Sequence, residues 1–249
     1  MIEEKSVTLR IADLTVRVEG PFHYDEEWLP NCGDYLCEDD KPDCVLRVSA
    51  GNLAKMQENH PDIPKAELEF VAVHTAIANR LSYSERIVFH GAVITCRKKG
   101  ILFAAPSGTG KSTQIALWKK YLGADVDIVN GDKPILHIEQ DRVTAYGTPW
   151  CGKERWQKNR STVLSAICFL ERGEIPTITR MKPEDCVDRL IRQFYLPLED
   201  TEASARTMEC ADLLARTVPM YLLTCDMTEN SVRCAYEEIM GEPYPGHGL

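Results

Sequence analysis

"AAPSGTGKSTQIALW", the stretch from Ala104 to Trp118, decides how the rest of this sequence is interpreted. Seven small or polar residues, Ser107 to Thr113, lie between two largely apolar ends. A packed core does not favour this order, because glycine inside an element loses side-chain contacts and costs backbone entropy. An anion does favour it, because glycines let successive backbone N–H groups turn toward a phosphate at the start of a helix. The stretch therefore predicts a phosphate-binding loop.

The loop follows the P-loop pattern G-x-x-x-x-G-K-[ST], with one change. Gly110, Lys111 and Ser112 end the pattern, and Ala105 replaces its first glycine. An apolar run at 100–105 predicts the preceding strand, and a helix is expected from Lys111. The alternative is a Gly-Ser turn that caps a helix. We expect Mg²⁺ on the Ser112 hydroxyl and nucleotide phosphates on the whole loop: Ser107, Gly108, Thr109, Gly110, Lys111, Ser112 and Thr113.

An acid at the end of another strand is also expected, because P-loop proteins use one to hold the metal. "DVDIVNGD", residues 125–132, ends in Asp132, whereas Asp125 and Asp127 lie where alternation predicts solvent exposure. Asp132 is therefore the candidate metal ligand and catalytic base, and the alternative is a turn aspartate. Lys111 and His90 are the other catalytic candidates. His90 is included because a hairpin that turns near Lys98 places it opposite residue 106, at the start of the loop. A core histidine is the alternative.

A loop rich in glycine and basic residues follows at 146–156, "YGTPWCGKERW". Lys153 is the candidate nucleotide contact in it. Two interpretations of its basic residues stay open, a phosphate clamp and a solvated loop: Lys153, Arg155, Lys158 and Arg160. Trp150 and Trp156 either stack on a base or pack in the interior.

The hydrophobic pattern predicts an α/β fold with a mixed, largely antiparallel sheet and flanking helices. Strands are expected over 6–19, at "CVLRVSA", in hairpins turning near Lys98 and at "EQDR", at "STVLSAICFLERG" and at "VPMYLLTCD". Helices are expected over 64–81, from Lys111, from Pro183, near 201–215 and at "TENSVRCAYEEIM". Turns and loops are expected over 21–44. We divide the chain into a strand-and-helix lobe, 1–85, for acceptor recognition, and a P-loop domain, 86–249; both could fold as one unit.

Composition excludes several classes of function. A net charge of -9 argues against general nucleic-acid binding, and no apolar run approaches the roughly 18 residues of a membrane span. The acidic start, Met1 to Glu4, does not resemble a signal peptide, so we expect a cytoplasmic protein whose ten cysteines are reduced. Cys32, Cys37 and Cys44 fit no familiar zinc spacing, so a polar loop is favoured over a metal site.

Four segments between Phe89 and Gly173 resemble the kinase domain of HPr kinase/phosphorylase, whose P-loop core is shared with phosphoenolpyruvate carboxykinase: "FHGAVI", "PSGTGKST", "VNGD" and "LSAICFLERG". The resemblance implies active-site roles for His90, Lys111, Ser112 and Asp132. It also implies that ATP or GTP with Mg²⁺ phosphorylates a serine hydroxyl of a peptide or protein.

The sequence departs from that family in two respects. Lys133 follows Asp132, where the family usually carries a second acid, and the family's C-terminal Gly-Arg-Asn segment is not recognisable. Two alternatives therefore stay open, a nucleotide-binding accessory protein without transfer activity and a kinase of a small hydroxy metabolite. The sequence makes no prediction of oligomeric state.

Overall fold

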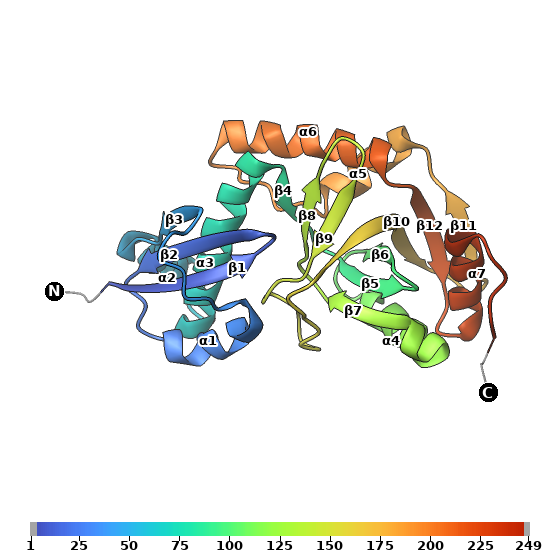
Figure 1. Cartoon of the computed structure of the whole chain (residues 1–249), viewed down its shortest axis with the longest axis horizontal. Helices are drawn as coiled ribbons and strands as arrows, with labels where there is room; N and C mark the ends of the chain where they lie inside the picture. Colours follow the sequence, from blue (N-terminus) through green and yellow to red (C-terminus); the bar gives the residue numbers. More distant parts are fainter. Residues whose placement is uncertain (1–3, 247–249) are drawn as a thin grey trace.

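The computed structural model describes residues 4–246, so Met1, Ile2 and Glu3, part of the acidic start, lie outside it. The N-terminal part is a small sheet packed against helices (Figure 1). Its elements are β1 (Lys5–Ile11), β2 (Leu14–Gly20), α1 (Asp25–Cys32), β3 (Cys44–Arg47), α2 (Ala50–Asn59) and α3 (Lys65–Leu81). β1 and β2 form an antiparallel hairpin, and β3 pairs with β2 in parallel. No helix within 4–246 is both long enough and apolar enough to cross a membrane.

The second sheet has nine strands in the order β4-β8-β9-β10-β6-β5-β7, with β12 on β10 and β11 on β12. They are β4 (Arg86–Val88), β5 (Ala92–Cys96), β6 (Lys99–Ala104), β7 (Val126–Asn130), β8 (Ile135–Ile138), β9 (Val143–Tyr146), β10 (Ser161–Arg172), β11 (Thr177–Arg180) and β12 (Met220–Cys225). Only the pairs that β10 makes with β6 and β12 are parallel. The expected mixed, largely antiparallel sheet is therefore confirmed.

Strand β10 makes the sheet curl. Its first residues pair antiparallel with β9, and its later residues pair in parallel with β6 and β12. The register shifts between Leu164 and Ala166, and an irregularity of this kind bends a strand and increases its twist. β6 and β10 therefore run side by side toward the end of the sheet where the 105–110 loop begins, and they end there at Ala104 and Arg172.

Helices cover both faces of this sheet (Figure 1). They are α4 (Lys111–Leu122), α5 (Pro183–Ile191), α6 (Thr201–Thr217) and α7 (Glu229–Met240). Alternate residues of β6 enter different cores: Leu102 contacts the core with α5 and α6, whereas Ile101 and Phe103 contact the core with α4 and α7. A third core joins the N-terminal part to the large sheet through Val88 and Trp150, among others.

The prediction of loops throughout 21–44 is wrong in part, because α1 lies within it. Three acids, Asp25 to Glu27, occupy its first turn, where their negative charge stabilises the helix by interacting with the positive end of its dipole. Trp28 of the same helix is buried. Pro30 lies inside the helix, and because proline disfavours helix interiors, the sequence did not predict this helix. Cys32 ends α1 and Cys44 begins β3, and the described residues contain no cluster of three or more His, Cys, Asp or Glu side chains suited to a metal ion.

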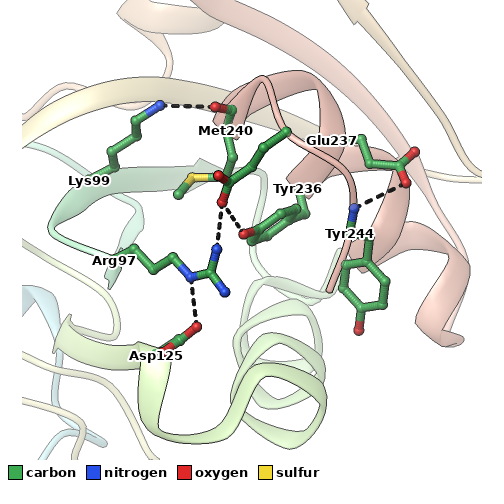
Figure 2. A network of polar contacts seen from close by, with 8 residues as sticks. Arg97, Lys99, Asp125, Tyr236, Glu237, Met240 and Tyr244 are labelled. Atoms are coloured by element: carbon green, nitrogen blue, oxygen red, sulfur yellow. Dashed lines mark hydrogen bonds and ion pairs between the residues drawn. The ribbon is translucent and has the colours of Figure 1, made fainter. Parts of the chain in front are cut away.

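The hairpin of β5 and β6 is clamped at its turn by the end of α7 (Figure 2). Arg97 donates to Asp125 at 2.7 Å and to Glu242 at 2.6 Å, and Tyr236 donates to the same Glu242 carboxylate. Arg97 and Lys98 both have positive φ, at 47° and 70°, as a tight two-residue hairpin turn requires. The predicted turn near Lys98 is thus confirmed, and it lies at the end of β6 opposite the 105–110 loop.

Candidate functional site

The loop between β6 and α4 contains two glycines with positive φ. Gly108 has φ +77° and Gly110 has φ +123°, which side chains rarely adopt, and an added Cβ at either position would meet nothing within 4 Å. The two glycines are therefore needed for their backbone angles, and the space beside them is open. α4 begins at Lys111, and Gln114 donates the first intrahelical bond, to the Gly110 carbonyl at 2.9 Å. The N–H groups before it are those a helix leaves unpaired.

Arg172, at the end of β10, holds this loop from outside. Its guanidinium donates to the carbonyl of Gly108 and, at 3.3 Å, to the carbonyl of Thr109. Because C=O and N–H of one peptide unit point in opposite directions, the Gly110 N–H points away from Arg172. A strand neighbouring β6 thus fixes the orientation of the loop's peptide units.

Three titratable side chains meet beside the loop. The Lys111 ammonium donates to the Ala105 carbonyl at 2.8 Å and lies 3.1 Å from Nε2 of His90. The same Nε2 lies 3.4 Å from a carboxylate oxygen of Asp132. One ring nitrogen cannot accept from Lys111 and donate to Asp132 at once, so Nε2 of His90 makes one of these two hydrogen bonds at a time.

Asn130 fixes the corner that carries Asp132. Its side-chain oxygen accepts from the backbone N–H of Asp132 at 2.9 Å and of Lys133 at 2.8 Å, and its amide nitrogen donates to the Thr148 carbonyl at 3.0 Å. Asn130 is completely buried, so this network is sheltered from water. The Asp132 carbonyl also accepts from Gly91 at 2.9 Å, which ties the corner to the residue after His90.

Burial and charge oppose one another at both ends of this cluster. Burial alone would raise the pKa of Asp132, but the hydrogen bond to His90 and the charges of His90, Lys133 and Lys111 hold it below its usual value. Burial lowers the pKa of Lys111, and the Asp132 and Glu154 carboxylates oppose that shift. Asp132 therefore stays a carboxylate at neutral pH.

A cavity of about 450 Å³ gathers these residues. Its lining is His90, Ser107, Gly108, Gly110, Lys111, Ser112, Thr113, Gly131, Asp132, Gly152, Lys153 and Glu154. The structure thus brings together every site residue singled out from the sequence except Thr109, which does not line the cavity and whose carbonyl faces Arg172. Their binding of nucleotide stays a prediction.

The basic loop divides into two groups. Lys153 lines the cavity, whereas Lys158 and Arg160 both pair with Asp127 of β7, so they form no clamp. Trp150 is buried against the ring of Phe70, which favours packing over base stacking. Sequence reasoning missed Asn130, Gly152, Glu154 and Arg172. Asn130 and Arg172 lie within quoted segments, but only the fold shows that they contact the site.

Comparison with known proteins adds a family. A family model described as "SynChlorMet cassette protein ScmC" matches residues 59–235, which include the whole cavity. The chain belongs to the ScmC family. A solved structure of the Hpr(Ser) kinase/phosphatase from Coxiella burnetii is similar to this ScmC-family chain at 13% identity and a TM-score of 0.34, over 62% of this chain and 93% of that one. A comparison with curated proteins gave no match.

Proposed function

We propose that this protein is a nucleotide-dependent phosphotransferase that moves the terminal phosphate of ATP or GTP to a hydroxyl, that of a serine in a peptide or protein. One observation carries the proposal: the glycine-rich loop, Lys111, His90 and Asp132 converge on a single cavity. Phosphoryl transfer depends mainly on positioning and charge stabilisation, and the cavity offers groups for both.

The loop fits the phosphates of a nucleotide. The free N–H groups at the start of α4 and the positive end of its dipole favour an anion at this point. The open space beside Gly108 and Gly110 leaves room for it. Lys111 and Lys153 supply positive charge, and neither forms an ion pair in residues 4–246.

Bound phosphate would redistribute the contacts of Lys111. A phosphate oxygen is a stronger partner for a buried ammonium than a neutral carbonyl and a histidine ring, because the bond is charge-assisted. Once Lys111 turns toward the phosphates, Nε2 of His90 is free to donate to Asp132. Nucleotide binding thereby selects one of the two hydrogen bonds of His90.

Asp132 and Ser112 would hold Mg²⁺, which neutralises charge on the phosphates. Two protein oxygens suit this ion, because Mg²⁺ is usually bound by one or two carboxylates together with phosphates and waters. Asp132, kept ionised by its neighbours, also accepts the proton of the acceptor hydroxyl. The acceptor oxygen bonds to the transferred phosphorus as the bond to the nucleoside diphosphate breaks.

A nucleotide-binding protein without transfer activity is the second candidate, and Lys133 in place of a second acid favours it. A kinase of a small hydroxy metabolite is a third form of the proposal, since only the acceptor differs.

Replacement of Asp132 separates catalysis from binding. Asp132→Asn keeps the size of the side chain and removes its charge. Release of phosphate from ATP should fall by about a hundredfold or more, the scale of losing a general base, while ATP still binds. The matched control is Asp141→Asn, at an exposed turn, which should behave as the parent. Equal turnover in parent and Asp132→Asn would leave Asp132 a turn residue, and ATP binding without turnover in either would favour the non-catalytic candidate.

A further inference from the structure

A second cavity of about 460 Å³ lies beside the first. Asp132 and Gly152 line both. Gly152 lies against Asp132 so closely that an added Cβ would come within 3.3 Å of the aspartate Cβ. The two cavities therefore meet at the proposed catalytic carboxylate, and only the first contains the phosphate loop.

The walls of this second cavity come from two parts of the molecule. α1 and α3 of the N-terminal part form one wall, and the 132–133 corner with the 149–155 loop forms the other. Trp28, Phe70 and Trp150 stack in series along it, with ring centroids 5.8 and 5.6 Å apart. Trp28 also donates to the buried Glu69 carboxylate at 3.1 Å. The apolar floor is thus preformed, as ligand cavities usually are.

Charged side chains of both signs surround that floor. Lys133 and Arg155 lie on the Asp132 side, because Lys133 follows Asp132 and Arg155 bonds back to Gly152. Glu27 and Glu67 lie on the opposite wall, on α1 and α3. None of these four side chains forms an ion pair with any described residue. Lys158 and Arg160 of the same loop, in contrast, share Asp127.

We infer that this second cavity binds the phosphoacceptor, and that the acceptor is a peptide segment with a carboxylate close to its serine and a basic side chain further along. The inference rests on the proposed function. Lys133 and Arg155 would hold the carboxylate and so place the hydroxyl at Asp132. Glu27 and Glu67 would hold the basic group and repel the nucleotide, which keeps the two substrates in separate cavities. Lys133 thereby takes a role in acceptor binding, because an acid at this position would repel the carboxylate of the acceptor.

The test is calorimetric binding of three short synthetic peptides without nucleotide. Each has one serine; one carries an adjacent aspartate and a distant lysine, one has these charges exchanged, and one is neutral. The first should bind tightest, and Lys133→Gln should weaken it about tenfold or more, the value of one charge-assisted contact. Glu67→Gln should weaken it too, whereas Lys55→Gln on the exposed face of α2 should not. A urea unfolding midpoint equal to that of the parent shows that each variant is folded.

Each other outcome has a defined meaning. Equal binding of the three peptides, or no effect of Lys133→Gln, overturns the inference. Free serine that binds as tightly as the first peptide overturns the peptide class and favours a small metabolite. Peptide binding that depends on Lys133, without phosphate transfer to the bound peptide, would overturn the proposed kinase function. The assignment of the second cavity as a peptide site would stand. Phosphate transfer to a molecule whose binding is unchanged by Lys133→Gln would overturn the inference but leave the kinase function.

Discussion

At the scale of single residues, His90 lies between the two charged side chains of the site, Lys111 and Asp132. Its Nε2 lies 3.1 Å from the Lys111 ammonium and 3.4 Å from the Asp132 carboxylate, so this one ring nitrogen faces both groups. Asn130 and Arg172 act one step further out. Asn130 accepts from the backbone N–H of Asp132, and Arg172 donates to the Gly108 carbonyl of the loop before α4. None of these contacts requires a residue outside the matched family segment.

Loss of Arg172 should loosen the loop. Arg172→Gln removes the guanidinium that holds the Gly108 and Thr109 carbonyls, so the loop would have to be ordered by the ligand itself. We expect ATP affinity to fall about fivefold, equivalent to about 1 kcal/mol for one hydrogen bond. The control is Arg180→Gln on β11, which is also exposed and, among the described residues, makes no hydrogen bond to the loop. Calorimetry with ATP that gives equal affinities for the two variants would show that Arg172 does not order the loop.

The sequence was informative at this scale wherever the chemistry is local. Glycines, a lysine and a hydroxyl in consecutive positions predict the loop, and the Gly-Asp pair that follows a strand makes Asp132 a candidate. Arg172 could not be assigned, because its partner is 64 residues away and only the parallel pairing of β10 with β6 brings them together. Thr109 does not line the cavity, and the pattern does not show which way each peptide unit turns, so its contact with a nucleotide stays a prediction.

The 147–160 loop shows the same limit at the scale of elements. Backbone bonds fasten it to the end of β7: Lys158 donates to Val129 at 3.1 Å and Gly131 donates to Trp156 at 2.8 Å. Long-range bonds of this kind have no signal in the sequence, so clamp and solvated loop both stayed open. The same holds for α1, whose internal proline argued against a helix. In contrast, the hairpins and the later helices were predictable from periodicity and turn residues alone.

Gly147 is where this loop should be most sensitive. An added Cβ would lie 1.9 Å from the Lys158 carbonyl oxygen and 2.8 Å from that of Val129, so the backbone has to move. We expect Gly147→Ala to lower the free energy of unfolding by about 1–3 kcal/mol, the usual cost of overpacking. Gly51→Ala, in the first turn of α2, has open surroundings and should keep or slightly raise stability. Urea titration compares the two variants, and equal stability would contradict the close packing of the loop.

Two substrate-sized cavities meet where the parts of the whole molecule join. The N-terminal part contributes α1 and α3, the large sheet contributes the corner after β7, and one hydrophobic core runs through both. Residues 1–85 contain no motif that points to a chemical role. They form one wall of the second cavity, and the charged residues of that wall are far apart in the sequence. That division of the chain stays a prediction, and so does acceptor recognition by its first part. None of the ten cysteines, all within residues 4–246, forms a disulfide in the structure, and their reduced state stays a prediction.

The central claim is that the loop before α4 binds the phosphates of a nucleotide, and Lys111→Ala tests it most directly. Calorimetry with ATP and Mg²⁺ should show affinity reduced about ten- to a hundredfold, because one charge-assisted contact of about 1.5–3 kcal/mol is lost. Lys120→Ala, on the exposed face of the same helix, should bind ATP as the parent does. Equal ATP affinity in Lys111→Ala and the parent would contradict the account.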